Sequence, residues 1–254
     1  HFKVTTENTE RLRVDSSGRL LVGTTSNSSP GGFDAKIQVA STSYDGSITL
    51  RRDSNNTGSQ TLAFGKSRGS LGGNTIVQSG DKLGTIDFYG ADGTDLNTIG
   101  AQLAAEVDGT PGSNDMPGRL VFKTTADGAS SATEAMRVDS KQRVTVKAGA
   151  IAEIDTLTSG STVTPDFATS CNFTLTLGTN LTIANPSNLT AGQSGSIFLV
   201  QDSTGSRTAA FGSYWDFAGG TAPVLTTTAS AVDRIDYIVR SSTSIHAVVT
   251  LAYS

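Results

Sequence analysis

The chain contains very few residues of the types that build covalent cross-links and metal centres. Its 254 residues include one cysteine, Cys171, and two histidines. A single cysteine excludes a disulfide within the chain, and two histidines exclude a histidine-rich metal cluster formed by one copy. Because Cys171 stands near Phe173 in a strand-like run, we expect it to be a small buried residue and not a nucleophile. The sequence predicts neither a cofactor nor a resident metal.

Basic clusters and long apolar runs are also missing. The net charge is -4, and no segment gathers lysine and arginine residues. This argues against a surface for nucleic acid or for an anionic membrane. The longest apolar candidates are as short as residues 197–200, far below the roughly 20 residues of a membrane-spanning helix. We therefore expect neither nucleic-acid binding nor membrane insertion.

Large apolar side chains are scarce, and the residues present favour β structure. The chain is 36% apolar and 6% aromatic, which is low for a compact monomer, and it contains 28 glycines. Short alternating runs recur between polar turns, which is typical of many short strands and tight hairpins. Residues 99–107 fit a helical period as well as a strand period. We predict a strand there because Gly100 weakens a helix and strand-turn units flank the segment.

One stretch of sequence occurs twice. Phe2, Lys3 and Thr5 recur 120 residues later, whereas the run from Glu10 to Arg19 recurs 124 residues later, as residues 134–143. The change of offset predicts an insertion in a turn at residues 127–132. Strand alternation predicts that Leu12 and Val14, and likewise Met136 and Val138, face a core.

The repeat ends near the middle of the chain, which indicates two domains. Residues 1–150 contain both copies and are interpreted as a β-rich shaft of hairpin units. Residues 151–254 contain no further copy, and from about Asp155 onward they show long alternating strands such as residues 234–240. We predict an all-β chain whose second domain is a β-sandwich of jelly-roll-like form.

The amino-acid sequence of the repeat also resembles that of a known protein family. The segments TERLRVDSSGRLLVGTTS and RLVFKTTADGASSATEAMRVDS resemble a repeat of tail-fibre proteins of tailed bacteriophages, marine and cyanobacterial phages especially. The last third of the chain is similar to terminal domains of such fibres. The resemblance implies a parallel, partly interwoven homotrimer, located in the virion as a tail appendage, whose tip contacts a glycan or protein of the host surface.

The same resemblance guides two further expectations. The chain opens in mid-repeat at His1, so we expect it to be the end of a longer protein whose N-terminal portion joins other tail proteins. Within the repeat, the pairs Glu10 with Arg13 and Glu134 with Arg137 would lie on strand faces or between chains. A solvated surface pair is the alternative for each.

Possible catalytic and metal-binding residues are sparse. Glu106 and Asp108 could form a carboxylate pair for glycoside hydrolysis, although a turn follows directly. Residues 53–58 copy the first half of a calcium loop, but Phe64 stands where a glutamate is needed. Asp92, Asp95 and Asn97 form a similar weak pattern. His246 could meet its copies on a trimer axis. For all of these, turn or surface roles are the favoured interpretation.

The aromatic cluster at residues 211–220 offers the best candidate for receptor contact. Tyr214, Trp215 and Asp216 could stack on and bind a sugar, whereas core packing of Trp215 and Phe217 is the more common use of such residues. We expect a non-enzymatic fibre that attaches to the host. A purely structural tail or capsid appendage and a tailspike depolymerase remain alternatives, the latter disfavoured because no regular coil period is present.

Overall fold

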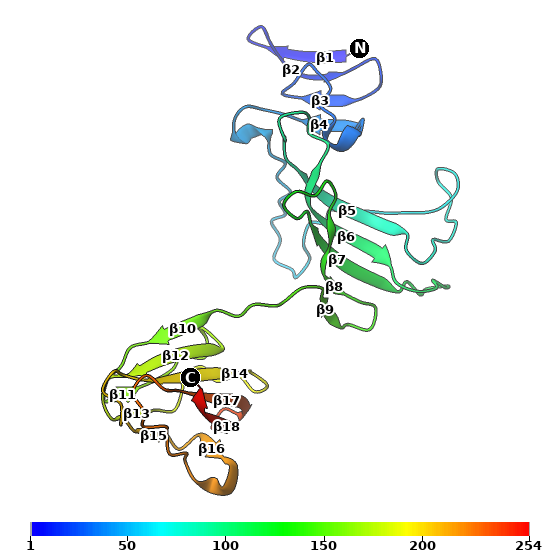
Figure 1. Ribbon diagram of the computed structural model, residues 1–254. Coiled ribbons are helices and arrows are strands. Elements are labelled where there is room, and N and C mark those ends of the chain that lie inside the picture. The colour runs from blue at the N-terminus through cyan, green and yellow to red at the C-terminus, as the bar shows by residue number, and fades with distance from the viewer. Residues whose placement is uncertain (1, 254) are drawn as a thin grey trace. The chain divides into compact units, whose positions relative to one another are not determined.

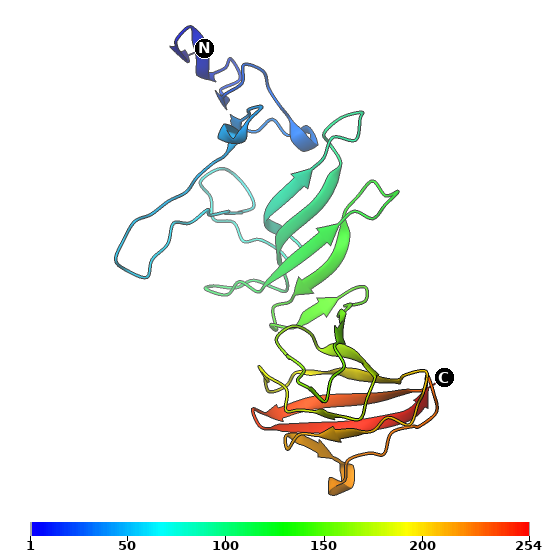
Figure 2. The same cartoon turned by 90° about the vertical axis from the view of Figure 1, so that its left-hand side faces the viewer.

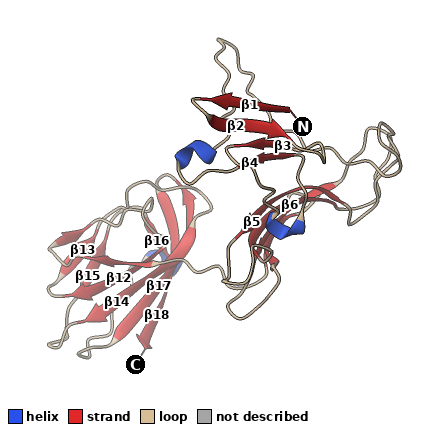
Figure 3. Ribbon diagram, turned by 90° about the horizontal axis from the view of Figure 1, so that it is seen from above, coloured by secondary structure: helices blue, strands red, loops and turns tan. Residues whose placement is uncertain are grey.

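The computed structural model describes residues 2–253, which form β structure almost throughout (Figures 1 and 3). The regular helical segments among these residues are three single 3-10 turns: η1 (Pro30–Gly32), η2 (Tyr44–Gly46) and η3 (Ala218–Gly220). The all-β prediction is therefore confirmed. The chain divides into two compact units, His1–Gly149 and Ala150–Ser254. None of the described helices is long and apolar enough to span a membrane.

The first unit contains two separate sheets. The first sheet has the order β1-β2-β3-β4, with antiparallel pairs except for the parallel pair of β3 and β4. Its strands are β1 (Phe2–Thr6), β2 (Thr9–Val14), β3 (Leu20–Val22) and β4 (Ile37–Val39). The second sheet is an antiparallel meander in sequence order. Its strands are β5 (Lys82–Tyr89), β6 (Ile99–Val107), β7 (Gly118–Thr124), β8 (Thr133–Val138) and β9 (Val144–Val146).

Residues 99–107 form β6, as the sequence predicted. The strand wins over the helix because both neighbours, β5 and β7, pair with it along its length. Tertiary pairing thus decides between two periods that the local sequence fits equally well.

The two copies of the repeat fold into the same antiparallel hairpin unit. Strands β2 and β3 pair Leu12 with Val22, and β8 and β9 pair Met136 with Val146 in the same register. The turns are equivalent as well, since the carboxylates of Asp15 and of Asp139 each accept two backbone N–H groups, one of them from the arginine four residues later. The repeated stretch of sequence therefore forms the same β-hairpin in both copies.

The first strand of the repeat does not align as the sequence suggested. Val4 pairs with Leu12, and Phe122 pairs with Met136, so Phe122 occupies the position of Val4 and not that of Phe2. The turn between the strands consists of residues 7 and 8 in the first copy and of residues 125–132 in the second. The insertion is therefore longer than the shared Phe-Lys pair of residues implied. Phe2 and Phe122 match in sequence but do not occupy equivalent positions in the two hairpins.

The second unit consists of two facing sheets. The larger sheet has the order β10-β12-β14-β17-β18-β16, and the smaller has the order β11-β13-β15. The strands of the larger sheet are β10 (Ile154–Leu157), β12 (Asn172–Leu177), β14 (Ser194–Gln201), β17 (Val232–Ser241), β18 (Ser244–Tyr253) and β16 (Trp215–Phe217). Those of the smaller are β11 (Thr162–Val163), β13 (Leu181–Ile183) and β15 (Ala209–Phe211).

The connectivity of this unit differs from that of a jelly roll. From β10 to β15 the chain alternates between the two sheets, and strands of the same sheet pair in parallel. Antiparallel pairing appears only where β17 and β18 add to the edge of β14. Two layers agree with the predicted sandwich, but the first six strands follow a coil. Equal alternation of apolar and polar residues suits both connectivities, so the sequence pattern could not separate them.

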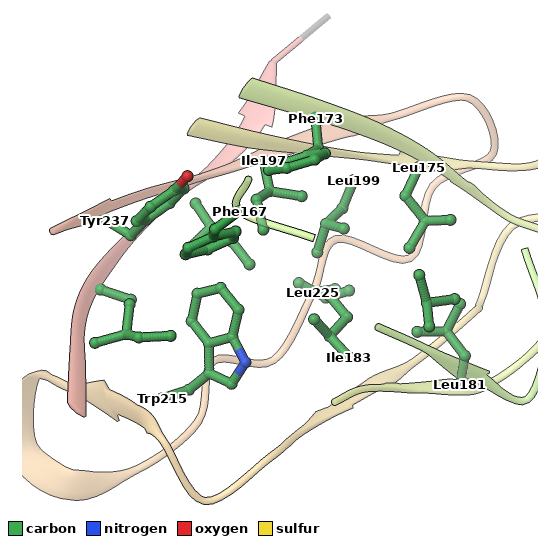
Figure 4. Packing of buried hydrophobic residues seen from close by; sticks show 14 of the residues in the cluster. Phe167, Phe173, Leu175, Leu181, Ile183, Ile197, Leu199, Trp215, Leu225 and Tyr237 are labelled. Carbon is green, nitrogen blue, oxygen red and sulfur yellow. The ribbon is translucent and has the colours of Figure 1, made fainter. Parts of the chain in front are cut away.

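A core of aliphatic and aromatic side chains fills the space between these sheets (Figure 4). Phe167 stacks on Tyr237 at 4.6 Å and on Phe173 at 5.8 Å between ring centroids. Cys171 is only half-buried, contrary to expectation, and its carbonyl oxygen accepts the Tyr237 hydroxyl at 2.8 Å. Phe173 points from β12 into the core, whereas Cys171 precedes the first residue of that strand, Asn172, and lies at the margin of the core.

Candidate functional site

Trp215 belongs to the core and not to the protein surface. Its side chain lies among Phe167, Phe211 and Tyr237 in edge-to-face contacts, with 7% of the residue exposed (Figure 4). The indole N–H donates to the Ala184 carbonyl at 3.1 Å, so its one polar group is also satisfied. Of the two uses that the sequence allowed for Trp215, core packing is the one observed.

The neighbours of Trp215 have different positions. Tyr214 is half-buried and packs against the same core. Asp216 points the other way because successive side chains of a strand alternate between faces, and it is exposed on the outer face of the larger sheet. The predicted triplet is therefore not one contiguous surface cluster, and Asp216 is its member most open to a ligand.

The pairing of β16 with β18 and of β18 with β17 gives Asp216 new neighbours. Asp216 lies opposite His246, and His246 lies opposite Ile238. One row further along, Asp236 lies opposite Val248. These five residues share the outer face of the sheet and were not grouped by the sequence pattern. Their alternation within each strand was visible, but the parallel pairing that joins β16 to β18 was not.

These side chains line a shallow groove of about 480 Å³. Its walls also include Phe217, Ala218, Tyr237 and Ala247. Apolar surface from Ile238 and Val248 therefore lies beside two carboxylates and an imidazole. Such a mixture suits a ligand that has an apolar face and several hydroxyl groups, as a sugar ring does.

Hydrogen bonds hold the polar groups of the groove in place, but some of their hydrogen-bonding atoms have no partner among the described residues. The Ser244 hydroxyl donates to Asp216 Oδ2 at 2.6 Å. Asp236 accepts the Ser196 hydroxyl at 2.6 Å and two N–H groups of Arg234 at 2.8 and 3.0 Å. Within residues 2–253, neither Asp216 Oδ1 nor the His246 imidazole makes a hydrogen bond. These two groups remain available to a ligand.

The carboxylates suspected of catalysis are engaged elsewhere. Glu106 is buried and accepts two N–H groups of Arg119, at 2.7 and 2.9 Å, and the Lys123 ammonium at 3.0 Å. Burial acts to raise the pKa of Glu106, but the bonds from Arg119 and Lys123 outweigh it and lower the pKa. Asp108 accepts the Ser140 backbone N–H at 2.9 Å, and its pKa is also lowered. A general acid needs a raised pKa, so this pair has the wrong electrostatics for glycoside hydrolysis.

The calcium-like loops are ordinary turns. Asn56 Oδ1 accepts the Gly58 N–H at 3.0 Å, and Asp53 pairs with Arg51 at 3.1 Å. Asp92 accepts the N–H groups of Thr94 and Asp95, which is the geometry of an Asx turn. Across residues 2–253, no three acidic, histidine or cysteine side chains gather as metal ligands would.

The charged pairs of the repeat lie within one chain. The guanidinium of Arg13 binds both carboxylate oxygens of Glu10, and Arg137 approaches Glu134 at 3.3 Å. The hydrogen bond from Arg13 lowers the pKa of Glu10. Both pairs are on strand faces, as one of the sequence-based alternatives held.

Comparison with known proteins gives limited matches. No protein-family model matches the chain, and no curated protein matches it significantly. The chain is similar to a solved structure of the carboxy-terminal domain of the bacteriophage T5 L-shaped tail fibre, with a TM-score of 0.43 and 18% identity over 57% of this chain and 62% of that one. A second structure of that domain, solved with its intramolecular chaperone domain, gives a TM-score of 0.44 and 18% identity over 57% of this chain and 42% of that one. The match spans less than two thirds of either solved chain.

Proposed function

We propose that this chain is a non-enzymatic segment of a bacteriophage tail fibre, located in the virion, that assembles as a homotrimer and contacts the host surface. The repeat wording supports the family. The observation that carries the assembly is the apolar face of the five-stranded sheet, which its own chain leaves largely uncovered.

This face is built from continuous cross-strand rows. One row runs across all five strands and contains Ile86, Leu103, Phe122, Met136 and Val146. Ile86, Phe122 and Val146 each expose more than a third of their surface. The opposite face, by contrast, buries Ala104 and Val121 beneath hydrogen-bonded polar side chains. An apolar face that remains open in the single chain marks an interaction surface.

The first sheet repeats this arrangement on a smaller scale. Phe2, Val14, Leu20 and Ile37 are aligned across its four strands, and Phe2 and Ile37 are both more than half exposed. Copies that bury these rows against one another would supply the core that a chain with 36% apolar residues lacks. Met136 lies in the row of the five-stranded sheet, and Leu12 lies on the same face of the first sheet as Val14, in the adjacent row with Val4 and Val22.

Native mass measurement tests the assembly. The wild-type chain is expected at three times its 26.1 kDa mass. Leu12→Asp and Met136→Asp should each shift the protein toward monomer, because a charge would be buried without a partner. Lys3→Asp, on the opposite face of the first sheet, is the matched control and should leave the trimer intact. A wild-type monomer with a sharp unfolding transition would refute the assembly.

For the host contact, we propose the groove around Asp216 and His246 as the site that binds a host-surface glycan. Two free polar groups beside an apolar floor support this choice, and three copies would multiply a weak contact through avidity. Replacing Asp216 and His246 together with Ala should reduce adsorption of the purified fibre to host cells at least about tenfold. Glu153→Ala, an exposed carboxylate of the same unit, should not change it.

The adsorption assay also separates the alternatives. If the wild-type trimer does not adsorb to the host at all, a purely structural appendage is the better description. If it adsorbs and the double variant adsorbs equally well, binding lies elsewhere on the second unit. Release of reducing sugar ends from host polysaccharide would instead support a depolymerase.

A further inference from the structure

Residues 47–66 form a long extended segment that has almost no bonding to the rest of its chain. It contains no strand, and none of its backbone groups makes a backbone-to-backbone hydrogen bond with a described residue. A single side-chain hydrogen bond joins the two halves of the segment, from Gln60 Nε2 to the Leu50 carbonyl at 2.9 Å. Figure 2 shows the segment as an open loop. We call it the arm.

The sequence of the arm is that of a pair of strands. Ile48 and Leu50 alternate with polar residues before the turn at residues 53–58, and Leu62 and Phe64 alternate after it. All four apolar side chains are about half exposed or more, and Ile48 reaches 72%. Extended backbone with this alternation ordinarily pairs with another strand and buries one face. The arm does neither within the single chain.

Phe64 shows which surface the arm fits. It lies over Gly84 of β5, so closely that a Cβ on Gly84 would be 2.6 Å from the Phe64 Cβ. Beside Phe64 lies an apolar groove of about 340 Å³, whose floor includes Ile86, Leu103 and Leu120. This floor is the open apolar face of the five-stranded sheet. Phe64 of the arm therefore contacts that face at β5, whereas Ile86, Phe122 and Val146 of the same face remain 36–43% exposed.

We propose that the arm is exchanged between copies, so that Ile48, Leu50 and Leu62 pack on the apolar face of the five-stranded sheet of a second copy of this chain. The partner is a second copy because each chain carries both halves of the contact: an arm with unpaired strand backbone and an apolar sheet face that matches it. The exchange would cover both the unpaired backbone of the arm and the exposed apolar face of the sheet. This inference rests on the proposed homotrimer and specifies what holds its copies together.

Hydrogen exchange of the wild-type full chain tests the pairing. If the arm pairs with another copy, amides of residues 47–66 should exchange at least about 100-fold more slowly in the assembled protein than in the Met136→Asp monomer. Exchange at the rate of an unstructured chain within an intact trimer would overturn the arm exchange and leave the proposed assembly standing. Equal protection in the monomer would also overturn it, because the arm would then pair within its own chain.

Substitution gives the second readout. Replacing Ile48, Leu50 and Leu62 together with Ser should lower the trimer fraction at least about tenfold at a fixed protein concentration, measured by native mass. The matched control replaces Thr49, Arg51 and Thr61, which alternate with the apolar residues of the arm, with Ala. This variant should preserve the trimer fraction. An unchanged trimer in the first variant contradicts the proposal, whereas a monomeric wild-type chain refutes the homotrimer itself.

Discussion

Phe167→Ala should destabilise the second unit more than a change at any of its exposed residues. The ring contacts Tyr237, Phe173 and Trp215, with centroid distances of 4.6, 5.8 and 6.4 Å, and the residue is 3% exposed. Truncating a buried Phe to Ala typically costs about 3–5 kcal/mol, because the lost contacts leave a cavity. With a urea dependence of about 2 kcal/mol per molar, the unfolding midpoint should fall by about 2 M.

Trp215 makes this measurement specific to one unit. It is the only tryptophan of the chain and lies in the same core, so its fluorescence reports the unfolding of residues 150–254 alone. Val224→Ala is the control, since Val224 is 82% exposed and its truncation should cost less than about 0.5 kcal/mol. A midpoint shift below about 0.5 M for Phe167→Ala would refute the shared aromatic core, and with it the assignment of Trp215 to that core.

Two further predictions concern the turn of the repeat. Hydrogen bonds from the Arg143 side chain and backbone hold the pKa of Asp139 down to about 2, so its contribution to stability is complete above its unfolded pKa of about 3.9 and is lost as the pH falls through about 2. Carboxyl chemical shifts should give a midpoint near 2 for Asp139, and a midpoint near 4 would contradict the bonds. Gly18→Ala should cost about 1 kcal/mol in urea unfolding because Gly18 has φ +70° with open space around it, whereas Gly90→Ala, also in open space but without a positive φ, should cost less.

The sequence predicted the kind of structure because each local signal had one physical meaning. Alternating residues indicated strands, and the Asp-centred turn of the repeat indicated a hairpin, both of which the structure contains. The first hairpin turn carries a weaker signal in the sequence, because glutamate seldom adopts a positive φ. Glu7 and Asn8 both adopt positive φ, of 49° and 60°, as a two-residue turn between twisted strands requires.

What the sequence could not specify was the pairing of distant strands. The parallel pair of Trp215 with Ile245 places Asp216 beside His246, and nothing near either residue encodes that partnership. The same limit explains the error at Phe2 and Phe122, since a register shift of two residues keeps every side chain on its own face. Candidate sites that depend on cross-strand neighbours therefore require the fold.

One position at which the two repeat copies differ in burial shows how a shared element adapts to its surroundings. Leu21 and Thr145 are equivalent, since they pair with Arg13 and Arg137 in the same register. Leu21 is 1% exposed because β4 continues the sheet on its far side, placing Gln38 opposite it. Strand β9, by contrast, is the edge of its sheet, and Thr145 there is only half-buried. A polar residue at that position costs little at an edge, whereas under a fourth strand it would lie buried. The residues that the two copies share thus specify the hairpin, and the residues that differ between the copies depend on the strands next to the hairpin.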